Sequence, residues 1–120
     1  MKRTVAVCAV AAAMAALGSS AFAETQTVKG ELISIMCYQG HGDEGRGEKH
    51  QACALKCVRE GYDAGVLTDD GVIYKITGKL ADDKYAKVQD LLTKHVVATG
   101  EVSDQGKDKT IDATSVALDK

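Results

Sequence analysis

Large aromatic side chains are scarce in this sequence. Its 120 residues include one phenylalanine, four tyrosines and no tryptophan. A small domain with few such side chains buries little apolar surface. We therefore expect a covalent cross-link or a bound metal to add to its stability.

Positive charge is not in excess either. The chain has 15 Lys and Arg residues against 17 Asp and Glu residues, and its formal net charge at pH 7 is −2. Proteins that bind nucleic acid combine a basic patch or groove with aromatic side chains on which bases stack. Because the basic residues here are dispersed and aromatic residues are few, the sequence argues against a nucleic-acid partner.

Catalytic motifs are absent as well. The sequence contains no Cys-x2-Cys pair, no Cys-x2-Cys-His haem-attachment motif, no phosphate-binding glycine loop, no nucleophile elbow and no pair of catalytic acids. Each of these motifs brings reactive groups together at the spacing that its chemistry needs. We therefore expect a protein that is not an enzyme and has no catalytic residues.

Residues 1–23 have the composition of a secretory signal peptide. Two basic residues are followed by an almost unbroken apolar run over Val5–Leu17, and Ala21–Ala23 is a small-x-small cleavage site. The apolar run is too short for a stable membrane span, and no second run is long enough for one. We expect this segment to be removed and residues 24–120 to form a single domain, periplasmic or secreted.

Hydrophobic periodicity and turn residues divide the remaining chain into strands and helices. Alternation of apolar and polar residues is typical of strands, whereas a spacing of three or four residues is typical of helices. Glycines and an Asp-Gly pair mark the turns. The expected elements are a strand over 25–36, a glycine-rich loop over 40–47, a helix over 48–60, a hairpin over 64–78, a helix over 81–94, and strands over 95–104 and 109–118 joined by a polar turn through Gly106.

This order of elements predicts an OB-fold-like barrel, a mainly β fold with helices. Five strands, with a helix between the third and the fourth, are the layout of this small Greek-key barrel. The connection after the first strand is longer than a simple turn and holds most of the cysteine and histidine residues. We therefore expect a five-stranded barrel with a Cys/His-bearing helical insertion after its first strand.

Five metal-ligating side chains are concentrated in this insertion. Cys37 is expected at the end of the first strand, and the glycines after it let the chain fold back. His50, Cys53 and Cys57 lie on one flank of the next helix, within an arc about 60° wide. The pattern Cys-x12-His-x2-Cys-x3-Cys offers three thiolates and an imidazole, which suit tetrahedral Zn or, because thiolates are soft, Cu(I). We predict a metal site of these four residues, with His41 in the loop as a fifth donor, in a storage, transfer or structural role.

A disulfide is the first alternative for the same cysteines. Removal of the signal peptide leaves Cys37, Cys53 and Cys57, and exported thiols pair unless something protects them. Cβ atoms four residues apart on a helix are separated by about 5–6 Å, whereas a disulfide needs about 3.8 Å. Cys37 with either helical cysteine is therefore the better bridge. The spare thiol would indicate another exported protein as a partner, a reactive thiol or a metal.

Thiol redox chemistry is the second alternative. The helix carries Cys-x3-Cys, whereas thioredoxin-like enzymes carry Cys-x2-Cys. A redox-active thiol also needs a pKa well below that of a free cysteine. The expected strand order is not the fold that usually carries this chemistry.

The motif resembles one shared by small exported bacterial OB-fold-like proteins of unassigned function. The closing strands, VVATGEV and IDATSV, resemble those of the same domains. The resemblance implies the fold and a shared role for the cluster, without naming a substrate or an activity. The matching residues of the motif are Cys37-Tyr38, His50-x2-Cys53-Ala54-x2-Cys57-Val58 and the following GVLTDDGVIY.

Overall fold

The computed structural model describes residues 24–104 and 109–119 of the chain. The expected signal peptide and the expected turn through Gly106 lie outside these residues. The division into a removed segment and a single domain therefore stays a prediction. Within the described part of the chain, no helix is both long enough and apolar enough to cross a membrane.

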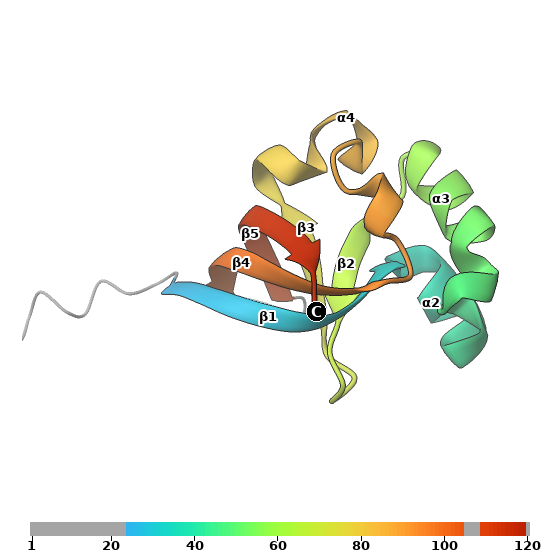
Figure 1. Ribbon diagram of the computed structural model, residues 1–120, viewed down its shortest axis with the longest axis horizontal. Coiled ribbons are helices and arrows are strands. Elements are labelled where there is room, and N and C mark those ends of the chain that lie inside the picture. The colour runs from blue at the N-terminus through green and yellow to red at the C-terminus, as the bar shows by residue number, and fades with distance from the viewer. Residues whose placement is uncertain (1–23, 105–108, 120) are drawn as a thin grey trace, which may run out of the picture.

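The strands close into a barrel (Figure 1). They follow one another around it in the order β1-β2-β3-β5-β4, and β4 pairs again with β1. β3 and β5 are parallel, whereas the other neighbouring pairs are antiparallel. This topology confirms the predicted mainly β, OB-fold-like barrel with helices. The strands are β1 (Glu24–Ser34), β2 (Ala64–Leu67), β3 (Ile73–Thr77), β4 (His95–Ser103) and β5 (Lys109–Leu118).

Aliphatic side chains fill the interior of the barrel. Alternate residues of a strand point to opposite faces, so Val96 and Ala98 of β4 are buried between more accessible neighbours. Tyr85 is the one tyrosine of the buried core, and its hydroxyl donates a hydrogen bond to the carbonyl oxygen of Ile76 at 2.8 Å. Burial raises the pKa of Tyr85. The core is thus built mainly from small and branched side chains, as the composition predicts.

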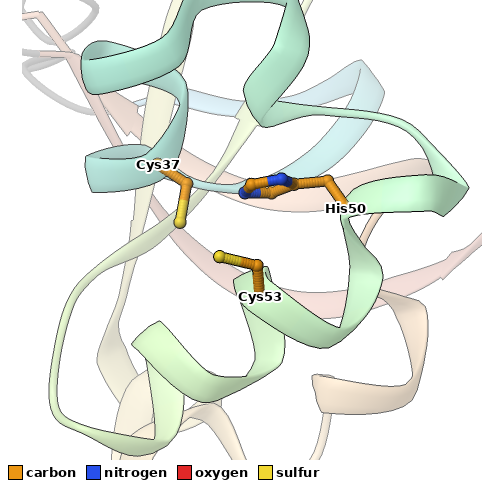
Figure 2. A group of neighbouring side chains, drawn as sticks. All are labelled: Cys37, His50 and Cys53. Atoms are coloured by element: carbon orange, nitrogen blue, oxygen red, sulfur yellow. The ribbon is translucent and has the colours of Figure 1, made fainter.

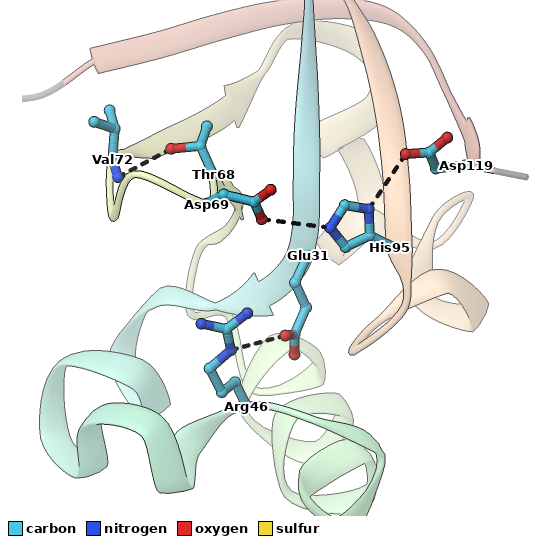
Figure 3. A network of polar contacts seen from close by, with 7 residues as sticks. All are labelled: Glu31, Arg46, Thr68, Asp69, Val72, His95 and Asp119. Carbon is cyan, nitrogen blue, oxygen red and sulfur yellow. Dashed lines mark hydrogen bonds and ion pairs between the residues drawn. The ribbon is translucent and has the colours of Figure 1, made fainter.

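The predicted hairpin is present as β2 and β3. Thr68 closes its turn with two hydrogen bonds to Val72. Its backbone N–H donates to the carbonyl of Val72 at 2.9 Å. Its hydroxyl accepts from the Val72 N–H at 3.1 Å (Figure 3). Gly71 has a φ of +89°, a conformation that glycine adopts without strain. The Asp-Gly signal therefore identified this turn correctly.

The first strand ends two residues before the predicted end. β1 stops at Ser34, and α2 (Ile35–His41) begins directly after it. The Ser34 side chain accepts a hydrogen bond from the Cys37 backbone N–H at 3.4 Å and so caps this helix. The prediction that Cys37 lies at the end of a strand is wrong, because this cap starts a helix where alternation alone suggested a continuing strand.

The glycine-rich segment is also more regular than predicted. Gly40 lies within α2, and η3 (Gly42–Gly45) follows as a single 3-10 turn. The second part of the insertion matches the prediction better, since η4 (Glu48–His50) leads into α3 (Gln51–Arg59). Ala54 and Val58 of α3 are buried against the barrel, as the predicted helix face requires.

The single helix predicted over 81–94 is wrong. This segment contains α4 (Asp82–Tyr85) and η6 (Gln89–Leu91), preceded by η5 (Gly78–Ala81). Asp83, Lys84 and Tyr85 have φ values of +57°, +58° and +62°, which no right-handed helix accommodates. Packing across the end of the barrel overrides the helical pattern. The apolar face of the pattern is nevertheless correct, because its members are buried or packed against the core: Tyr85, Val88, Leu91 and Leu92.

Candidate metal centre

Two neighbouring helical segments carry the five predicted ligand residues. Figure 1 shows α2 and α3 side by side at one edge of the barrel. Cys37 lies in the first turn of α2 and is 5% exposed. His50 ends η4, and Cys53 follows one turn later in α3. The site is therefore formed where the return of the chain brings α3 against α2.

Cys37, His50 and Cys53 come within ligand distance of one another. One ring nitrogen of His50 and the two sulfur atoms all lie within 4.8 Å of each other. Figure 2 shows the imidazole and the two thiols pointing toward a common centre. Zn–S and Zn–N bonds of about 2.3 and 2.0–2.1 Å place tetrahedral ligands about 3.5–3.8 Å apart. Small side-chain adjustments would therefore bring these three donors around one metal ion.

The imidazole of His50 has an unsatisfied nitrogen. Its Nε2 atom is buried and makes no hydrogen bond within the described part of the chain. A buried polar atom without a partner is costly, and such atoms are rare in folded proteins. A neutral imidazole nitrogen is also a common metal ligand. The unsatisfied nitrogen therefore suits a site in which a metal completes its bonding.

Cys57 lies beside this group without belonging to it. Its sulfur is 3.1 Å from the sulfur of Cys37, whereas the three-donor group contains only Cys37, His50 and Cys53. The three cysteines in the described part of the chain, Cys37, Cys53 and Cys57, are free thiols. Cys57 is thus placed to donate a fourth ligand through a side-chain movement, or to pair with Cys37.

His41 is not among the converging donors. It is the exposed last residue of α2, and its ring centroid is 5.9 Å from that of His50, with the two planes 60° apart. The structure thus brings three of the five predicted ligand residues into one group. It places Cys57 in contact with that group and His41 at its edge.

The thiols of Cys37 and Cys53 resist ionisation. Burial, together with a hydrogen bond to Cys57, raises the pKa of Cys37. Desolvation and the neighbouring Cys37 raise the pKa of Cys53. A reactive redox thiol needs the opposite shift, so these directions argue against Cys37 and Cys53 as reactive redox thiols. A bound cation would reverse the effect, because it stabilises thiolates.

The raised pKa values predict how the stability of the reduced, metal-free protein depends on pH. Cys37 and Cys53 are neutral in the folded state up to a higher pH than in the unfolded chain. The stability that these neutral thiols contribute is fully present below the pKa of an unfolded cysteine, about 8.5. It is lost as the pH rises through their higher pKa values in the folded state. We expect urea unfolding to show falling stability above pH 8.5. Cys53→Ser should lessen this fall, and an unchanged profile in that variant would contradict the assignment.

Glu31 is a residue near the site that the sequence did not single out. Alternation along β1 places it opposite Leu32, on the side expected to face water, yet its side chain is only 8% exposed. Its carboxylate accepts a hydrogen bond from Arg46 Nε at 2.8 Å (Figure 3). It accepts a second one from the backbone N–H of Gly47 at 2.6 Å. The sequence gives no sign that Glu31 is buried, because an acidic residue in a strand usually faces water. Its partners, Arg46 and Gly47, belong to a loop that is distant in sequence.

The third histidine takes no part in the cluster. His95 begins β4 and is about half exposed, with Nδ1 3.3 Å from a carboxylate oxygen of Asp119 and Nε2 3.8 Å from one of Asp69 (Figure 3). These contacts join β4 to the hairpin turn and to the residue after β5. His95 is therefore a boundary residue of the barrel and a useful comparison for His50.

Searches of protein-family models, curated proteins and solved structures find no match to this chain. The class of the protein therefore follows from its own topology and geometry. It is a small OB-fold-like barrel with a Cys2His group that could hold a metal ion.

Proposed function

We propose that this is an exported metal-binding protein that holds Zn or Cu(I) through thiolates and one imidazole. The proposed ligands are Cys37, His50 and Cys53, with Cys57 as the fourth. The observation that carries the proposal is the unsatisfied, buried Nε2 of His50 in a group with two thiols. Three soft donors and a borderline one suit these metals and do not suit calcium or magnesium.

The proposal also covers the location of the protein and the group of proteins to which it belongs. The composition of residues 1–23 supports a periplasmic or secreted location. The Cys-x12-His-x2-Cys-x3-Cys pattern supports membership in the small exported bacterial OB-fold-like proteins that share it. Storage, transfer or structural stabilisation are the roles that such a site supports, with the metal ion and another exported protein as partners.

A disulfide-stapled binding module is the second candidate. The 3.1 Å separation of the Cys37 and Cys57 sulfurs favours it, because the two atoms already touch. Oxidation of this pair would join α2 to α3 and leave Cys53 as the spare thiol. The two candidates exclude each other at Cys37, which cannot be a thiolate ligand and part of a disulfide at once.

Metal analysis and thiol titration of protein purified from its native compartment distinguish the two candidates. We expect one bound Zn or Cu per chain and three thiols that titrate after the metal is removed. A metal-free protein with one disulfide and one free thiol would overturn the metal proposal. In that case, Cys37→Ser should lower the free energy of unfolding of the oxidised protein by about 2–4 kcal/mol, with His50→Ala nearly neutral.

A further inference from the structure

We infer that Glu31 is a positioning residue of the metal centre, acting through the loop that joins its ligands. This inference rests on the proposed function. The loop, here named the strap, comprises residues 42–47 and connects α2, which carries Cys37, to η4, which carries His50. Three observations link Glu31 to both ligands.

The first observation is the way in which Glu31 is bound. One carboxylate oxygen accepts a hydrogen bond from Arg46 Nε at 2.8 Å, and the other accepts one from Gly47 N at 2.6 Å. Both oxygens therefore bind residues of the strap. The side chain is buried, and bonds to a buried charged group are stronger than neutral ones. Because Glu31 belongs to β1, these bonds tie the C-terminal end of the strap to the barrel.

The second observation connects this anchor to His50. The carbonyl oxygen of Gly47 accepts a hydrogen bond from the backbone N–H of His50 at 2.9 Å. Gly47 has a φ of +88°, which orients its N–H toward Glu31 and its carbonyl toward η4 in a conformation that other residues rarely adopt. The position of the His50 backbone therefore depends on the peptide groups that Glu31 holds.

The third observation connects the strap to Cys37. Gly45 is buried, and a Cβ atom at this position would collide with the carbonyl oxygen of Cys37. The strap therefore lies directly on the backbone of one ligand while it supports the backbone of another. Anchoring by Glu31 fixes the spacing between Cys37 and His50 before any metal arrives.

The inference predicts the effect of Arg46→Met on Zn²⁺ affinity. If Glu31 acted only by attracting the cation through space, removal of the nearby positive charge would tighten binding. If it acts by positioning, loss of the Arg46 bond should loosen the strap and weaken binding severalfold. Glu31→Ala, which also releases Gly47, should weaken binding by about tenfold or more. Competition with a chromophoric chelator under reducing conditions measures both effects.

Lys75→Met is the matched control. It also removes one positive charge, from an ion pair of the barrel in which Lys75 Nζ lies 3.7 Å from a carboxylate oxygen of Asp63. We expect this variant to bind Zn²⁺ as tightly as the wild type or slightly more tightly. Binding that is unchanged or tighter in Arg46→Met would overturn the inference, and so would an equal loss of affinity in the Lys75→Met control.

Amide exchange of the metal-free protein supplies a readout that does not depend on metal. The His50 amide, which is bonded to the Gly47 carbonyl, should exchange faster in Arg46→Met and in Glu31→Ala than in the wild type. The Leu32 amide, which is bonded to the Lys94 carbonyl, should exchange at the wild-type rate in both variants. Equal protection of His50 in the variants and the wild type would overturn the positioning role. A wild-type protein that binds no Zn²⁺ would instead refute the proposed function. If Glu31→Ala does not fold, Arg46→Met alone decides the inference.

Discussion

Cys37→Ser is expected to lower the affinity for Zn²⁺ by more than about a hundredfold, which exceeds the loss typical of groups that only support a ligand. Cys37 is the ligand from α2, whereas His50 and Cys53 both come from the segment formed by η4 and α3. Without the Cys37 thiolate, the remaining donors share one continuous segment and no longer join two elements. Chelator competition under reducing conditions measures the loss.

The same variant should lose most of the stabilisation that zinc provides. A hundredfold loss of affinity removes about 2.7 kcal/mol of that stabilisation when the metal is in large excess over both dissociation constants. Cys57→Ser is the matched comparison, because it removes a neighbouring thiol that lies outside the three-donor group. It should weaken binding less than Cys37→Ser does. Equal or reversed effects would show that the ligand set is assigned incorrectly.

His50→Ala is expected to lower Zn²⁺ affinity by about ten- to a hundredfold while changing the stability of the metal-free protein by less than about 1 kcal/mol. The affinity falls because the nitrogen ligand is lost. Stability changes little because the variant loses some packing but also removes a buried nitrogen without a hydrogen-bond partner, which costs free energy in the metal-free state. Urea unfolding with and without Zn²⁺ separates the two quantities.

His95→Ala is the control for this prediction. It removes the same imidazole from a half-exposed position between Asp69 and Asp119 and should leave Zn²⁺ affinity unchanged. A large fall in metal-free stability in His50→Ala, with no change in affinity, would identify His50 as a packing residue. That result would contradict the assignment of His50 as a metal ligand.

Local patterns were enough to predict much of the barrel. Alternation located the strands because successive residues of a strand point to opposite faces, and the Asp-Gly pair located the turn between β2 and β3. The helical spacing of His50 and Cys53 also placed them on one flank, because three residues make nearly one turn of helix. These features depend on neighbouring residues in the sequence, which is why sequence reasoning reached them.

Other features depend on the place of a segment in the fold. The segment 81–94 has a helical pattern, yet it crosses the end of the barrel as short turns that direct Tyr85 to the carbonyl of Ile76. The start of α2 likewise depends on a cap by Ser34, which shortens the predicted strand. Tertiary packing prevailed in the first case and a local hydrogen bond in the second.

The sequence by itself determined which candidate donors the insertion offers, since residue type and helical spacing decide which groups a short segment can present. Tertiary structure alone decided how these groups meet. It placed Cys37 against His50 and Cys53, brought Cys57 to within 3.1 Å of Cys37, and left His41 at the edge. It also buried Glu31 beneath a loop that is distant in sequence. Contacts of this kind arise from the return of the chain onto the barrel, and no local pattern encodes them.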